Sequence, residues 1–181
     1  MTSGDHKSPL FIGKSVLHVG CGGSPLPTWL SDNDETRFDI DESYSPDIVG
    51  DMRDAESAVQ GKRFDVIFTN HSVEHLYPQD VIPTLEGFRA VLNSGGVAIV
   101  IVPNLKGIVP TLDVVYESPS GPINGRDMYY GLERLLKDSP YMAHHTGFVK
   151  ETLELAFKQS GFSSCMVTED DTFNLIGVGV A

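Results

Sequence analysis

The sequence predicts an α/β fold in which a doubly wound, mostly parallel sheet of seven strands ends in an antiparallel strand. Three observations predict it. Short apolar runs recur along the first hundred residues, and their continuous rather than alternating character indicates strands buried on both faces of a parallel sheet. Helical patterns separate several of these runs, as right-handed crossovers require. The last twenty residues instead hold two apolar runs joined by an acidic turn, which predicts an antiparallel hairpin.

The predicted elements follow one another in the order that this fold class requires. Five apolar runs are expected to form parallel strands: Ser15–Val19, Arg37–Ile40, Asp47–Val49, Asp65–Thr69 and Gly96–Val102. The closing hairpin is expected to pair Ser163–Thr168 with Phe173–Val180. Residues 79–93 and 148–160 are expected to form helices, because each segment carries an apolar face for packing on the sheet and is followed by glycine.

Residues 104–147 interrupt this alternation of strands and helices. They are rich in proline and glycine, and one helix is expected within them, at Asp127–Lys137. A connection of this length is usually functional, and its tyrosines favour an ordered lid over a disordered linker. A chain of 181 residues is too short for two comfortable α/β domains. We therefore expect one domain over residues 1–181, with residues 104–147 as a lid-like insertion.

Composition excludes several classes of protein. The net charge of −12 opposes binding to nucleic acid or to anionic lipid. The two cysteines, Cys21 and Cys165, form no C-x-x-C pattern, which argues against a disulfide framework and against a cysteine-rich zinc site. The polar start of the chain does not resemble a signal peptide, and no apolar run reaches the roughly 18 residues of a membrane helix. These features predict a soluble, cytoplasmic protein.

The main chemical signal is the sequence V-L-H-V-G-C-G-G-S at residues 16–24. It places a glycine-rich turn at the carboxyl end of the first strand, where open α/β sheets bind ligands and where glycine lets a ligand approach the backbone closely. A dinucleotide fingerprint starting at Gly20 would need its third glycine at Pro25, and no Gly-Lys-Ser/Thr triplet follows a strand. The loop therefore fits an adenosine ligand without a pyrophosphate. The alternative is a turn with a structural role alone.

Acidic residues follow the next two strands. Asp39 lies nineteen residues after Gly20, where a carboxylate can accept hydrogen bonds from both hydroxyl groups of a ribose. Asp41 is its rival for this role, and either residue could instead belong to a solvated acidic turn. Asp51 follows the third strand, where it could accept a hydrogen bond from an adenine amino group or could cap a helix over residues 53–60.

Five segments spread over residues 14 to about 104 are informative as a set. They are VLHVGCGGS, FDIDES, PDIVGDMRD, FDVIFTNHSVEHL and VLNSGGVAIVIVPN. In this order and spacing they resemble the class I S-adenosylmethionine-dependent methyltransferases. The resemblance implies a sheet with strand order 3-2-1-4-5-7-6, the cofactor S-adenosylmethionine and the product S-adenosylhomocysteine. It also implies methyl transfer to a small-molecule acceptor, with residues 104–147 near the acceptor.

The resemblance further implies which residues bind the cofactor. The loop glycines would line its methionine moiety, Asp39 would hold the ribose, and Asp51 with Met52 would flank the adenine. Asn70 and His71 would close over the cofactor near its sulfonium. The complete expected set is His18, Gly20, Cys21, Gly22, Asp39, Ile40, Asp51, Met52, Asn70 and His71.

Two positions depart from the pattern of this family. His18 stands where the family usually has an acidic residue that helps to hold the amino group of the cofactor, and Ser24 replaces the third loop glycine. A histidine does not offer the same charge, so His18 could equally be a histidine of the core. These departures leave a second function class open, a methyltransferase fold without catalytic activity.

Residues His71, Glu74 and His75 also form the pattern H-x-x-E-H, which on a helix can bind zinc with the glutamate as general base. A zinc hydrolase is therefore an alternative from a different class. Its helical context is missing, because strand residues lead straight into His71, and the downstream sequence shows no third ligand in a recognisable setting. We therefore predict no metal site, and we expect Glu74 and His75 to begin the following helix.

A second histidine pair, His144 and His145, lies near the end of the insertion. These histidines could line a pocket for the acceptor, or they could belong to the internal packing of the lid. Thr146, directly after them, is a candidate cap for the helix predicted from residue 148.

Methyl transfer from a sulfonium is an in-line displacement, so the enzyme would act mainly by holding nucleophile and methyl group together. A base is needed only for an acceptor whose proton has a high pKa, and His71 is the candidate because imidazole titrates near neutral pH. The residues after the fourth strand, Thr69 to Ser72, do not form an N-P-P-Y-like tetrapeptide. The sequence therefore predicts a small oxygen, nitrogen or carbon acceptor, and it predicts no particular oligomeric state.

Overall fold

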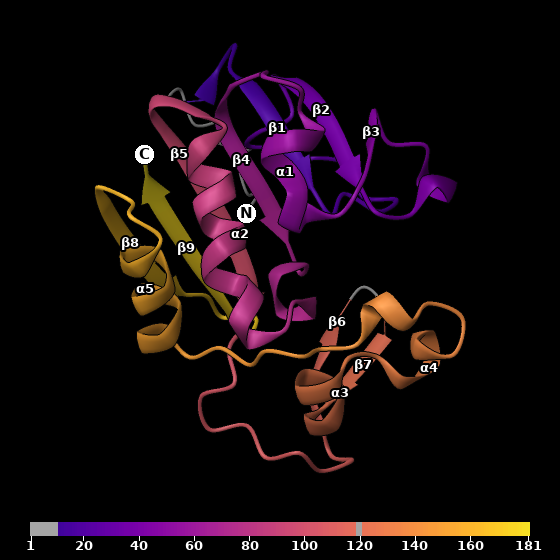
Figure 1. Ribbon diagram of the computed structural model, residues 1–181. Coiled ribbons are helices and arrows are strands. Elements are labelled where there is room, and N and C mark those ends of the chain that lie inside the picture. Colours follow the sequence, from indigo (N-terminus) through magenta and orange to yellow (C-terminus); the bar gives the residue numbers. More distant parts are fainter. Residues whose placement is uncertain (1–10, 119–120) are drawn as a thin grey trace, which may run out of the picture.

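Seven strands form one sheet in the computed structural model, which describes residues 11–118 and 121–181 (Figure 1). The strand order is β3-β2-β1-β4-β5-β9-β8. The strands are β1 (Ser15–Val19), β2 (Asp34–Asp39), β3 (Ile48–Val49), β4 (Phe64–Asn70), β5 (Leu92–Pro103), β8 (Ser164–Glu169) and β9 (Asn174–Val180). All pairs are parallel except those of β9, which runs antiparallel to both β5 and β8. The predicted fold class and strand order are confirmed.

The central strands are apolar on both faces, as the continuous runs indicated. Along β1, Val16 packs into one cluster of buried side chains and Leu17 packs into the other. The neighbouring strand β4 repeats this division with Val66 and Ile67. Each such side chain stabilises the fold by about 1.5–3 kcal/mol when it leaves water. The two clusters therefore hold β1 and β4 in the middle of the sheet.

Three helices cover one face of the sheet: α1 (Ala55–Ala58), α2 (Pro78–Ala90) and α5 (Lys150–Gln159) (Figure 1). Helix α2 ends three residues earlier than expected, because the chain turns at Val91 directly into β5. Helix α5 packs closely on β9, where Gly177 and Gly179 leave room for the Phe157 ring.

Among the described residues, the connection between β1 and β2 covers the other face, and it contains no helix. Residues 20–33, all of which the structure describes, form turns between β1 and β2. Leu26 and Leu30 from this segment are buried against Val16 and Phe68, and Trp29 meets the Phe68 ring edge-on at a centroid distance of 5.8 Å. The connection thus packs as a hydrophobic loop.

The insertion between β5 and α5 lies at the carboxyl ends of the parallel strands (Figure 1). It contains a two-stranded antiparallel sheet, β6 (Val114–Ser118) with β7 (Gly121–Asn124), and two short helices, α3 (Gly125–Tyr130) and α4 (Glu133–Leu136). The single helix expected at Asp127–Lys137 is therefore wrong. A capping box between Asn124 and Asp127 starts α3 early, and Gly131, at φ +89°, ends it.

Within the described part of the chain, no helix combines the length and the apolar character that a membrane crossing needs. The first ten residues, whose polar character entered the expectation of a protein without a signal peptide, lie outside the described residues.

Replacing Gly179 by alanine is expected to lower the free energy of unfolding by about 1–3 kcal/mol, because the new Cβ would overlap the rings of Phe157 and Phe162. The matched control is Gly87→Ala in α2, where a Cβ meets no atom within 4 Å. That change is expected to stabilise the helix by about 0.5–1 kcal/mol. Urea denaturation followed by circular dichroism measures both variants. Equal stability of Gly179→Ala and the parent would contradict the close packing of α5 on β9.

Candidate functional site

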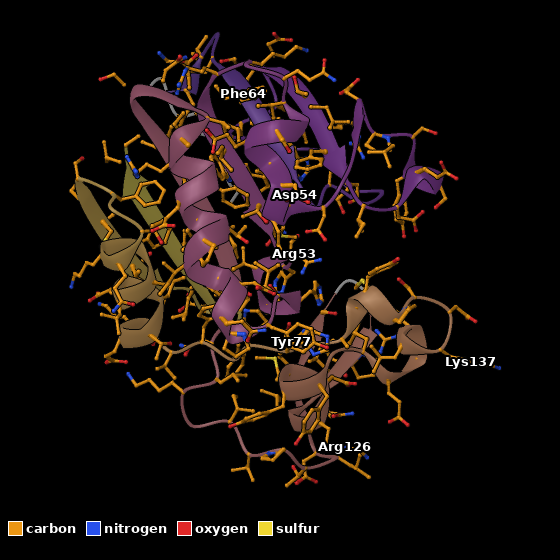
Figure 2. All side chains as sticks on the ribbon, viewed as in Figure 1. Arg53, Asp54, Phe64, Tyr77, Arg126 and Lys137 are labelled. Carbon is orange, nitrogen blue, oxygen red and sulfur yellow. The ribbon has the colours of Figure 1, made fainter. Side chains whose placement is uncertain are left out.

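A cavity of about 730 Å³ lies where β1, β2 and β4 end, between the sheet and the insertion. Its size is within the range of cofactor sites, about 300–1,000 Å³. The sheet side is lined by residues 19–22, 38–41, 50–53 and 70–72, and the insertion contributes residues 139–142 and His145. Figure 2 shows Arg53 and Tyr77, both lining residues, in the region where the two parts face each other. A smaller recess of about 390 Å³ adjoins it between Ile40 and Tyr141.

The glycine-rich bend after β1 forms one wall of the cavity. Gly20 has φ +63°, and a Cβ on it would collide with the Ser72 side chain, so the turn requires glycine. Gly22 has φ +46°, and a Cβ on it would meet no atom within 4 Å although the residue lines the cavity. The guanidinium of Arg37 holds the bend from outside by donating to the carbonyl oxygens of Gly22, at 2.5 Å, and Ser24, at 3.1 Å.

Asp39, at the end of β2, is the carboxylate that faces this bend. Its Oδ2 accepts from the backbone N–H of Gly22 at 2.7 Å, and its Oδ1 accepts from the N–H of Asp41 at 2.9 Å. Each carboxylate oxygen keeps a further lone pair for a ligand. The rival Asp41 instead caps the 3-10 helix Glu42–Tyr44 by accepting from the N–H of Ser43, and these bonds lower the pKa of Asp41.

Asp51 combines the two roles that the sequence left open. It lines the cavity, and its carboxylate caps the 3-10 helix Met52–Asp54 by accepting from the N–H of Arg53 at 2.9 Å. The Arg53 guanidinium lies 2.6 Å from the same carboxylate and lowers the pKa of Asp51. The helix expected over residues 53–60 is thus split into this 3-10 turn and the short α1.

His18 lies inside the sheet. It is 2% exposed, its Nδ1 lies 2.7 Å from Oε1 of Glu35 on β2, and its ring contacts Phe68. Burial lowers the pKa of His18 more than the Glu35 carboxylate raises it. As far as the structure describes the chain, the lining of the cavity does not include His18, although all the other expected cofactor-binding residues belong to it.

His71 follows β4 in the left-handed region, at φ +55°, and lines the cavity. Its Nδ1 lies 3.2 Å from Oε1 of Glu74, which is only 1% exposed. Burial lowers the pKa of His71, but Glu74, together with Asn174 and Asp170, raises that pKa by more, so the net shift is upward. Burial likewise raises the pKa of Glu74, and the histidines around it, His71 foremost, shift it downward overall.

The segment after His71 differs from the expected helix start. Residues Val73–His75 form a 3-10 helix, and α2 begins only at Pro78, so the prediction that Glu74 and His75 begin the following helix is wrong. The proline at the first helical position fixes this later start. Nothing in this arrangement resembles the continuous helix that an H-x-x-E-H zinc protease needs.

The end of the insertion is attached to this 3-10 helix. The backbone N–H groups of His145 and Thr146 donate to the carbonyl oxygen of Glu74 at 2.9 and 3.0 Å. The Thr146 hydroxyl donates to the carbonyl oxygen of Leu76 at 2.6 Å. Helix α5 begins only at Lys150, with Val149 at its N-cap position, so the prediction that Thr146 caps this helix is wrong.

The two histidines of the insertion have different surroundings. His145 lines the cavity and stacks on Tyr77 at a centroid distance of 4.2 Å. His144 turns toward Glu74, with its Nε2 4.0 Å from Oε1. Burial lowers the pKa of His144.

Sequence reasoning missed several lining residues. These are Ser72, His75, Tyr77, Tyr141 and Met142. His145 also lines the cavity, whereas the sequence left open whether it lines a pocket or packs within the lid. Ser72 and His75 stand inside a segment that was already singled out, so the sequence held a signal for them. Tyr141 and Met142 reach the cavity only because the insertion folds back across the sheet, and local sequence does not encode that return.

Comparison with known proteins places these features in a family. A family model described as "Methyltransferase domain" matches residues 7–165. The ubiquinone biosynthesis O-methyltransferase of Salmonella paratyphi A is 29% identical over 75 residues, which cover 41% of this chain and 31% of that protein. The chain therefore spans about a third of the length of this curated relative.

Solved structures share the fold. A SAM-dependent methyltransferase from Archaeoglobus fulgidus matches with a TM-score of 0.61 at 14% identity, over 93% of this chain and 86% of that chain. TehB from Haemophilus influenzae matches with a TM-score of 0.57 at 14% identity, over 94% of this chain and 58% of that one. Because the family model covers most of the sequence and the fold agrees, the chain belongs to the class I S-adenosylmethionine-dependent methyltransferases.

Proposed function

We propose that this protein transfers a methyl group from S-adenosylmethionine to a small-molecule acceptor by in-line displacement. One observation carries the proposal. The Asp39 carboxylate is fixed by the N–H of Gly22 directly across the glycine bend, at a cavity of about 730 Å³. A ribose diol is the ligand group that such a carboxylate recognises next to a glycine-rich turn in an open α/β sheet.

The residues around the cavity fit this cofactor. The space beside Gly22, which a side chain would fill, would receive the methionine moiety, with Gly20 and Cys21 beside it. Asp39 would bind the ribose hydroxyls, next to Ile40. When bound, the cofactor supplies an activated methyl group on a sulfonium, which a nucleophile can displace.

The remaining cofactor contacts come from two other strand ends. Asp51 and Met52 after β3 would flank the adenine, and Asn70 with His71 after β4 would close the side nearest the acceptor. His18 stays outside this set because it is enclosed between Glu35 and Phe68.

We propose that residues 104–147 form the lid of one domain spanning residues 1–181 and hold the acceptor. Tyr141, Met142 and His145 line the cavity from this side, and the stacked rings of His145 and Tyr77 offer a flat aromatic wall. Holding the acceptor against the cofactor is the principal source of rate enhancement for such a displacement.

His71 is the proposed base for an acceptor that must lose a proton. Its Nδ1 points to Glu74, which leaves Nε2 as the nitrogen that can accept the proton. The buried Glu74 carboxylate would then stabilise the resulting imidazolium.

The Asp39→Ala variant is expected to bind S-adenosylhomocysteine at least about tenfold more weakly than the parent, because hydrogen bonds to a charged group contribute about 1.5–3 kcal/mol. The matched control is Asp41→Ala, which removes a neighbouring carboxylate whose bonds go to the Ser43 turn. Titration calorimetry measures both affinities, and thermal melts confirm that both variants fold. Unchanged affinity in Asp39→Ala would remove the basis of the proposal.

The His71→Asn variant is expected to lower kcat by about 10²–10⁴ for a hydroxyl acceptor, since the base is lost. Asparagine tolerates the left-handed backbone that His71 adopts at φ +55°, so the fold should be kept. Transfer of labelled methyl groups to a panel of small phenols and catechols, chosen for the aromatic wall, measures the effect. Parent-like turnover of an acceptor by His71→Asn would exclude His71 as the base.

A further inference from the structure

Three side chains from two distant segments meet beside the cavity. Glu74 and His75 come from the 3-10 helix after β4, and His144 comes from the end of the insertion. One potential ligand atom from each lies within 4.8 Å of the other two. Glu74 is 1% exposed and the side chain of His144 is 13% exposed, while His75 lines the cavity.

The Glu74 carboxylate lacks the hydrogen bonds that a buried charge requires. Among the described residues, neither of its oxygens has a hydrogen-bond partner. In folded proteins, a buried carboxylate is normally hydrogen-bonded, paired with a cation or bound to a metal. His71 is the competing cation, but its Nδ1 lies 3.2 Å from Oε1 without hydrogen-bond geometry, and its side chain is 40% exposed.

The hydrogen bonds of the two other imidazoles decide which nitrogen of each ring keeps a lone pair for a cation. Nδ1 of His75 lies 3.1 Å from the carbonyl oxygen of Ala143, and Nδ1 of His144 lies 3.0 Å from that of Met128. A carbonyl oxygen only accepts, so each Nδ1 must carry the hydrogen and donate it. In the neutral ring this leaves the lone pair on Nε2. Ligating histidines in metal sites are oriented in this way, with the second nitrogen donating to a carbonyl or carboxylate.

We propose that Glu74, His75 and His144 bind a divalent transition-metal cation of the Zn²⁺ class. Two imidazoles and one carboxylate are a donor set that suits Zn²⁺ better than Mg²⁺ or Ca²⁺, which prefer oxygen ligands. The prediction of no metal site rested on the missing helix and the missing third ligand of a site formed by His71 and His75. The cluster proposed here is a different one, because Glu74 is itself a ligand and His144 of the folded insertion takes the place of His71. The site goes beyond methyl transfer, because a cation held there joins the insertion to the end of the sheet.

Zinc binding by the full chain tests this site directly. After removal of metals with a chelator, titration calorimetry with Zn²⁺ is expected to give one tight site per chain in the parent. Glu74→Gln and His144→Ala are each expected to weaken that site by about 100-fold or more, since even loss of an outer partner costs 10–100-fold. The matched control, His145→Ala, removes the neighbouring imidazole that stacks on Tyr77 and should keep the site.

A second measurement addresses variants that fold poorly. At a Zn²⁺ concentration about one hundred times Kd, the cation is expected to raise the Tm of the parent by about 5 °C or more and to leave that of His144→Ala unchanged. Co²⁺ in place of Zn²⁺ should give visible absorption bands in the parent that His144→Ala lacks. Mg²⁺ should produce neither effect.

Two results would overturn the metal site. One is a parent chain that binds no Zn²⁺ beyond weak surface association, which would leave Glu74 balanced by the surrounding histidines alone. The other is equal Zn²⁺ affinity in the parent, Glu74→Gln and His144→Ala, which would place any zinc elsewhere on the chain. Both measurements need no cofactor or acceptor, so their failure is distinguishable from failure of the methyltransferase proposal.

Discussion

The hydrogen bond between the Gly22 N–H and the Asp39 carboxylate joins the ends of two neighbouring strands into one binding surface. It fixes the glycine bend relative to β2 and orients the carboxylate toward the cavity, at a heavy-atom distance of 2.7 Å. Arg37 supports the bend from the opposite side through the Gly22 carbonyl. The glycine bend and the end of β2 both line the cavity, so this hydrogen bond fixes the shape of that part of the cavity wall.

A second junction connects the insertion to the sheet through main-chain carbonyl groups, beside the stacked rings of Tyr77 and His145. The main-chain carbonyls of Glu74 and Leu76 accept from residues 145 and 146, and the carbonyls of Ala143 and Met128 face the two imidazoles. These contacts orient the two imidazoles and fix the end of the insertion on the 3-10 helix Val73–His75. They therefore explain how a segment of short helices and a two-stranded sheet can wall a cavity built by seven strands.

The fold could be predicted from the sequence because the continuous apolar runs and the closing hairpin are local patterns. Strand β1, for example, begins and ends at the predicted residues. The residues that line the cavity from the sheet side could be predicted for the same reason, because they directly follow the predicted strands. His18 was harder, since its neighbour Glu35 lies on another strand and only the pairing of β1 with β2 brings them together. The His144–Glu74 proximity depends on the path of the whole insertion, which no local pattern encodes.

The position of Trp29 has a practical consequence for spectroscopy. It is the single tryptophan of the chain, and it packs between Phe11 and Phe68 on the face of the sheet opposite α1, α2 and α5. It does not belong to the cavity lining formed by the described residues. Its intrinsic fluorescence therefore reports the integrity of that hydrophobic layer, and it gives an optical signal of sheet disruption that is separate from the tyrosines around the cavity.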